Sequence, residues 1–161
     1  MQTPELDTLY REVVLDHYRN PRGREPVPSP TVESEGKNPL CGDETKIRVE
    51  LKDGRIARIQ AQGMGCSISV ASASMMSELL EGKTLEEARR VMRAFEGLMR
   101  GEEVPQDLDL GDLEALDGVK RFPVRIKCVL LAWKTLEEAL RDVPEAGQEA
   151  GPSGEPGGSR A

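Results

Sequence analysis

The chain has 161 residues, a formal net charge of −7 and a hydrophobic fraction of 37% that includes only 3% aromatic residues. A chain of this length forms about one domain, here with an aliphatic core, and its acidic balance argues against nucleic acid, which needs a concentrated basic face. The first twenty residues are charged throughout, and no stretch approaches the roughly 18 apolar residues of a membrane span. We therefore expect a cytoplasmic protein with neither a nucleic-acid nor a membrane partner.

The first third of the chain predicts a helix, a loop and a hairpin. Residues 4–18 form an amphipathic helix after Thr3, with a stripe of Leu6, Leu9, Val13 and His17. The single histidine, His17, is interpreted as a helix-surface or packing residue. The Pro-rich residues 22–39 are mostly extended loop, in which residues 31–36 can pair as an edge strand. The hairpin has one solvated face and turns at Asp53-Gly54; its alternating apolar residues are Ile47, Val49, Leu51, Ile59 and Ala61.

Two helices follow the hairpin. Small and apolar residues over 67–80 predict a buried helix, whose Met75 and Met76 fill the core. Thr84 and Glu87 form a capping box, which predicts a second, amphipathic helix over residues 84–99.

The last third is predicted to be less regular. Residues 101–122 are acidic and are interpreted as a solvated loop with one helical turn at 112–116. A final helix is expected to begin at Cys128 and run to Leu140, with Trp133 on its apolar stripe. Residues 144–161 contain almost nothing apolar and predict a disordered tail.

The three cysteines are the candidate chemistry. An odd number cannot all pair in disulfides, and without an export signal we expect reduced or metal-bound thiols. The positions 41, 66 and 128 contain no CxxC pair, and burial as small hydrophobic residues is the alternative reading.

The surroundings of the cysteines favour a metal site instead. Gly42 lets the chain bend, so that the Cys41 thiolate and the Asp43 carboxylate can reach one ion. Cys66 opens a helix, where the helix dipole lowers the pKa of a thiol, and Cys128 is expected to begin the last helix beside Lys127.

Three thiolates and one carboxylate suit tetrahedral zinc, and the sulfur-rich set also suits ferrous iron or an iron-sulfur cluster. A carboxylate is a harder ligand than a fourth thiolate and binds a thiophilic metal less firmly. We therefore infer a site that can open and exchange, unlike a closed structural zinc site.

Four segments resemble the signature segments of the IscU/NifU N-terminal family. They are Leu15 to Arg22, Cys41-Gly42-Asp43, Gly63 to Ser69 and Arg125-Ile126-Lys127-Cys128. The resemblance covers roughly residues 4–143. It implies an α+β fold in which a small antiparallel sheet of about three strands packs against helices, with the cysteines and the aspartate at one exposed end. The chain then divides into an assembly domain of residues 1–143 and a tail of residues 144–161.

Two differences between this sequence and the IscU pattern indicate the branch within the family. Lys127 stands where IscU has a histidine before its third cysteine, and an acidic segment precedes Cys128. Both features resemble the SufU branch, which implies zinc and a SufS-type cysteine desulfurase as partner. By residue matching, Cys41 is the sulfur acceptor, and Asp43, Cys66 and Cys128 hold the metal. The chaperone-recognition segment is only partly present, as residues 122–125, so no chaperone step is expected.

Three functions remain open at this point. In the first, Cys41 acts as a zinc-dependent sulfurtransferase that accepts desulfurase sulfur for cluster assembly. In the second, a cluster is assembled on Cys41, Cys66 and Cys128 as a scaffold and handed to apo iron-sulfur proteins. In the third, the chain is a structural zinc adaptor.

Overall fold

The structure is a computed structural model that describes residues 4–39 and 42–144, without the side chains of residues 4–9. Its elements are α1 (Pro4–Arg19), β1 (Val32–Asn38), β2 (Asp43–Lys52), β3 (Arg55–Met64), α2 (Ser67–Leu80), α3 (Leu85–Met99), η1 (Gly111–Arg121) and α4 (Pro123–Leu140). The predicted tail, and with it the boundary at residues 143 and 144, falls largely on residues 145–161, outside the described part. The division into domain and tail therefore stays a prediction.

The three strands form one antiparallel sheet in the order β1-β2-β3. Asp53 and Gly54 connect β2 to β3 with φ angles of 55° and 75°. Positive φ at both central residues is typical of the type I′ hairpin turn, whose twist matches that of the strands. The predicted hairpin and the predicted edge strand are both confirmed, and the strands extend beyond the apolar residues that indicated them.

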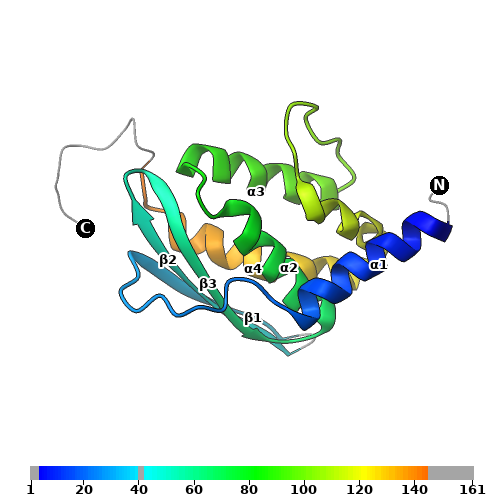
Figure 1. Cartoon of the computed structure of the whole chain (residues 1–161), viewed down its shortest axis with the longest axis horizontal. Coiled ribbons are helices and arrows are strands. Elements are labelled where there is room, and N and C mark those ends of the chain that lie inside the picture. The colour runs from blue at the N-terminus through cyan, green and yellow to red at the C-terminus, as the bar shows by residue number, and fades with distance from the viewer. Residues whose placement is uncertain (1–3, 40–41, 145–161) are drawn as a thin grey trace.

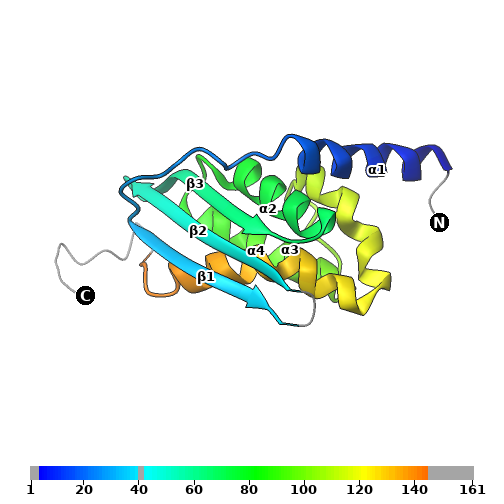
Figure 2. The same ribbon diagram turned by 90° about the horizontal axis from the view of Figure 1, so that it is seen from below.

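The helices cover one face of this sheet and leave the other face open (Figures 1 and 2). Alternate β2 residues such as Ile47 and Val49 are buried beneath the helices. On the open face, Arg48 lies 3.3 Å from a Glu33 oxygen, and Arg58 lies 3.0 Å from a Glu50 oxygen. The expected α+β fold with one solvated sheet face is therefore confirmed.

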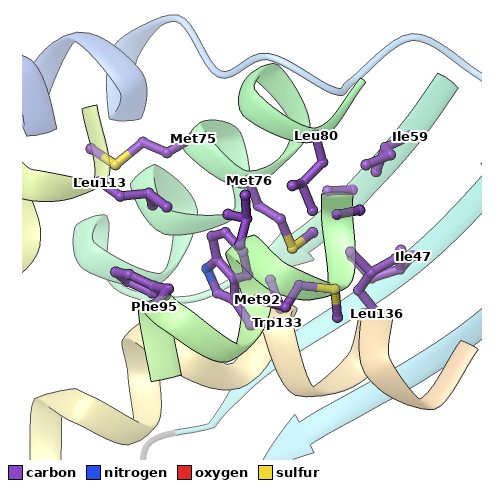
Figure 3. Packing of buried hydrophobic residues seen from close by; sticks show 14 of the residues in the cluster. Ile47, Ile59, Met75, Met76, Leu80, Met92, Phe95, Leu113, Trp133 and Leu136 are labelled. Carbon is purple, nitrogen blue, oxygen red and sulfur yellow. The ribbon is translucent and has the colours of Figure 1, made fainter. Parts of the chain in front are cut away.

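The core lies between the sheet and the helices and is mostly aliphatic (Figure 3). Met75, Met76 and Trp133 are buried in it, as predicted. The rings of Phe95 and Trp133 are tilted against each other with their centroids 4.8 Å apart. The Trp133 indole N–H donates a 2.9 Å hydrogen bond to Ser72, which satisfies the one polar atom of this ring in the core.

The segment before α4 differs from its prediction. Instead of a solvated loop with one helical turn, η1 is a 3₁₀ helix of 11 residues. Leu113 and Leu116 are fully buried under it, while its acidic residues Asp112 and Glu114 are exposed. The many acidic residues of this segment suggested a solvated loop, but Leu113 and Leu116 pack η1 against the core.

The start of the last helix was also predicted wrongly. α4 begins at Pro123, a residue that suits the first helical position because the proline has no N–H to leave unpaired. Cys128 therefore lies in the second turn of α4 and is buried, not at its N-terminal end. Within the described residues, no helix is long and apolar enough to cross a membrane.

His17 joins three elements. It is fully buried on α1, as its interpretation as a packing residue allowed. Its Nδ1 lies 2.7 Å from the Ser74 hydroxyl on α2, and its Nε2 lies 2.9 Å from Oδ2 of Asp112 on η1. Both ring nitrogens are thus satisfied, and α1 is tied to the helices that position the site.

Candidate metal centre

Three segments that are distant in sequence meet at one end of the sheet. Asp43 begins β2, Cys66 stands between β3 and α2, and Cys128 lies on α4. The antiparallel register pairs Glu44 with Met64, which brings the start of β2 beside the end of β3. One ligand atom from each of Asp43, Cys66 and Cys128 lies within 4.8 Å of the other two.

Cys41, the fourth predicted ligand, lies outside the described residues, so its place in the site stays a prediction. The neighbouring Gly42 has a φ of 75°, in the left-handed region that favours glycine. This agrees with the predicted bend between Cys41 and Asp43.

The Asp43 carboxylate is held from two sides and is only 2% exposed. Its Oδ1 accepts a 3.2 Å hydrogen bond from the backbone N–H of Cys66, and its Oδ2 accepts one from the Ser69 hydroxyl. Gly65 makes this fit possible, because a Cβ there would lie 2.5 Å from Oδ1. The carboxylate therefore has one fixed orientation at the start of α2.

Cys66 is the N-cap residue of α2 and is half-buried. Its burial acts to raise the pKa of the thiol, and so does the negative charge of Asp43. The Ser69 hydroxyl and the backbone N–H groups of Ser69 and Ile68 outweigh these effects, so the pKa of the Cys66 thiol is lowered. The predicted thiolate character at this helix N-terminus is supported.

Cys128 has a different environment from the one that the sequence predicted. It is 3% exposed, and its Sγ lies 3.9 Å from the Val124 carbonyl oxygen one turn earlier in α4. Because α4 begins five residues before it, the dipole argument for a helix terminus does not apply to Cys128. Its neighbours Arg125 and Lys127 are exposed to solvent.

The donor set fits a small thiophilic cation. A tetrahedral zinc ion with ordinary bonds to sulfur and oxygen has ligand atoms about 3.6 to 3.8 Å apart. Cys66 Sγ already lies 4.0 Å from Asp43 Oδ2, so small side-chain movements suffice. The arrangement therefore suits a metal ion.

The contacts of Ser69 and Gly65 with Asp43 were not predicted from the sequence. Ser69 stands three residues after Cys66 and so lies one helical turn from it, a spacing that brings side chains together. That spacing was the available signal for Ser69. The contact between Gly65 and Asp43 depends on how β2 and α2 meet, and the sequence has no local signal for it.

A second group of ligand-type atoms surrounds His17. One atom each of His17, Glu78 and Asp112 lie within 4.8 Å of one another. Glu78 also lies 3.3 Å from Arg22, and both carboxylates are about half exposed. Hydrogen bonds and ion pairs account for this arrangement without a metal ion.

Comparisons with known proteins agree with the geometry. The family model of the NifU-like N terminal domain matches residues 9–129. The zinc-dependent sulfurtransferase SufU of Bacillus subtilis is 44% identical over 135 residues, which cover 84% of this chain and 91% of that protein. The iron-sulfur cluster assembly scaffold protein IscU of Thermotoga maritima is 38% identical over 135 residues, which cover 84% of this chain and 94% of that protein.

A solved structure has the same fold. It comes from Fervidobacterium islandicum and is described as a proposed iron-sulfur cluster assembly scaffold protein for the SUF system. It superimposes with a TM-score of 0.76 at 36% sequence identity, covering 83% of this chain and 97% of that one.

Proposed function

Because the chain belongs to the NifU-like N-terminal domain family of iron-sulfur cluster assembly proteins, we propose that it accepts sulfur from a cysteine desulfurase at Cys41 while zinc is held by Asp43, Cys66 and Cys128. The observation that carries this proposal is the meeting of these three ligands at one point. Three candidate ligands belong to described elements of the fold. We propose that the fourth, Cys41, is the ligand that departs to accept sulfur.

The transfer step requires only two cysteines. The Cys41 thiolate attacks the outer sulfur of a persulfide on the desulfurase and forms a new sulfur-sulfur bond. The bond from that sulfur to the desulfurase cysteine breaks, and the electron pair leaves on the desulfurase thiolate. When bound, the metal supplies the positive charge that keeps the cysteine ligands deprotonated at neutral pH.

The surroundings of the site suit a protein partner. Met64 stands two residues before Cys66, and Phe122 and Val124 stand six and four residues before Cys128; their side chains are 70%, 57% and 67% exposed. Large exposed apolar side chains near a site are typical of protein interaction surfaces. A SufS-type cysteine desulfurase is the proposed donor, and cluster-assembly proteins or apo iron-sulfur proteins are the proposed recipients.

A scaffold role is the second candidate. It is favoured by the similarity to IscU proteins whose names describe them as scaffolds, such as that of Thermotoga maritima. In this role Cys41, Cys66 and Cys128 bind iron, or an iron-sulfur cluster, as cargo that is passed to apo-proteins. The same ligand set suits both roles, because thiolates bind zinc and iron-sulfur clusters alike.

Desulfurase turnover separates the two roles. With sulfur transfer, substoichiometric protein stimulates cysteine turnover, Cys41→Ser abolishes the stimulation, and mass spectrometry finds one added sulfur atom on the Cys41 peptide. A coloured protein that carries acid-labile sulfide after reconstitution, without stimulation of the desulfurase, would favour the scaffold instead.

A further inference from the structure

We infer that Ser69 is a positioning residue of this centre, whose hydroxyl fixes the Asp43 carboxylate and thereby sets how firmly the metal is held. This inference rests on the proposed metal site.

Ser69 lies between all three described ligands. It occupies the third position of α2, so its side chain points back toward the helix start and Cys66. Its hydroxyl donates to Oδ2 of Asp43, lies 3.5 Å from Sγ of Cys66 and lies 3.3 Å from the Cys128 carbonyl oxygen. One hydroxyl group thus touches β2, the start of α2 and α4.

The single hydroxyl proton goes to the Asp43 carboxylate. A charged acceptor makes a stronger hydrogen bond than a neutral carbonyl or a thiol sulfur. Oδ1 of the same carboxylate accepts the N–H of Cys66, so both oxygens have a partner and the group cannot rotate. A carboxylate oxygen can accept a hydrogen bond and bind a metal ion at the same time, because it has two lone pairs.

This orientation matters most for the weakest ligand of the set. A carboxylate binds a thiophilic metal less firmly than a thiolate does, so its contribution depends on being preorganised. The Ser69 hydroxyl also lies 3.5 Å from Sγ of Cys66, so the same side chain contacts a second candidate ligand. Through both contacts Ser69 holds the Asp43 carboxylate and the Cys66 thiol in position at the site.

The test measures zinc affinity by competition with a coloured chelator, using Ser69→Ala. We expect the zinc dissociation constant to rise by about 10- to 100-fold, as for other groups that orient a metal ligand. Ser69→Thr retains the hydroxyl and should restore most of the affinity. Ser67→Ala is the matched control, because Ser67 lies in the same helical turn but faces the groove beside Tyr10 and Val119.

The double variant separates positioning from a general structural effect. In an Asp43→Ala background, Ser69→Ala should weaken zinc binding much less than it does in the unmodified protein, since the carboxylate that it orients is gone. Circular dichroism and thermal unfolding of the metal-free variants verify that each is folded.

Two results overturn the inference. One is an unchanged zinc affinity in Ser69→Ala while Asp43→Ala weakens it; the other is an equal loss from Ser69→Ala with and without Asp43. An unchanged zinc affinity in Asp43→Ala itself would instead contradict the proposed metal site, so the two failures are distinguishable.

Discussion

The backbone N–H of Cys66 donates a 3.2 Å hydrogen bond to Oδ1 of Asp43, which joins the first residue of β2 to the start of α2. This bond places two candidate ligands from different elements against each other before any ion is bound. It also gives a carboxylate partner to the positive end of a helix, an arrangement that stabilises both.

Gly65→Ala should damage the site while leaving the fold intact. The added Cβ would lie 2.5 Å from Oδ1 and 2.7 Å from Cγ of Asp43, so the carboxylate must move away from Cys66. We expect zinc affinity to fall by about tenfold or more, as when the support of a ligand is lost. Chelator competition measures this effect.

The matched control for this change is Gly118→Ala in η1, where the nearest atom to an added Cβ lies 3.5 Å away on Arg121. Its zinc affinity should equal that of the unmodified protein. Equal affinities in all three proteins would show that the contact between Gly65 and Asp43 does not shape the site.

His17→Ala should destabilise the protein through the junction of α1, α2 and η1. The change removes a fully buried ring and its hydrogen bonds with Ser74 and Asp112, while the Ser74 hydroxyl still accepts the backbone N–H of Arg22. We expect the free energy of unfolding to fall by about 3 kcal/mol. Urea unfolding measures it.

Asp112→Ala makes the comparison for His17. Its carboxylate is half exposed, so its loss should cost about 1 kcal/mol. A cost for His17→Ala that is no larger than this would contradict the assigned role of His17.

Gly36→Ala should force β1 away from α4. A Cβ at Gly36 would lie 2.1 Å from Oγ1 of Thr135, closer than two such atoms can approach. We expect a loss of about 1 to 3 kcal/mol in the free energy of unfolding, typical of overpacking.

Thr135→Ala tests the cause of this loss. It removes the clashing oxygen. The Cβ of residue 135 at 3.4 Å and Cδ1 of Leu131 at 3.3 Å remain near the new methyl group, and a shift of a few tenths of an ångström in the flexible Leu131 side chain relieves these contacts. The cost of Gly36→Ala should therefore nearly vanish in the Thr135→Ala background. A cost that persists there would mean that the glycine is needed for its backbone instead.

Removal of the metal should leave the protein folded. The hydrophobic core is formed by the sheet and the helices α2, α3, η1 and α4. Of the described ligands, Cys128 alone is counted among the buried hydrophobic residues, so the core does not depend on the metal. Thermal unfolding of chelator-treated protein should remain cooperative, with a midpoint that rises on adding zinc. Loss of all cooperative unfolding without metal would favour the structural zinc adaptor, whose ion is needed for folding.

Much of the fold could be predicted because local patterns agreed with tertiary structure. The predicted helix over residues 67–80 coincides with α2, and the capping box of Thr84 and Glu87 is present with both of its hydrogen bonds. The hairpin turn followed from the Asp53-Gly54 pair. In each case the residues that define the element lie within a few positions of one another.

The errors arose where acidic or proline residues concealed the pattern. Leu113 and Leu116 anchor η1 beneath a charged surface, and Pro123 begins α4 where a proline was not taken as a helix start. The grouping of Asp43, Cys66 and Cys128 was predicted from the surroundings of the cysteines and then from the family resemblance, and the structure brings these three residues together. The contact between Ser69 and Asp43 could not be predicted from spacing, because the two residues lie 26 positions apart and meet only through the way that β2 and α2 pack.

The most direct test of zinc-dependent sulfur transfer is the metal and acid-labile sulfide content of the protein purified anaerobically from its own cells, compared with Cys41→Ser and Cys66→Ser. We expect about one zinc per chain without sulfide, retained in Cys41→Ser and lost in Cys66→Ser. Iron and sulfide in equal amounts would contradict it and make the protein a cluster scaffold.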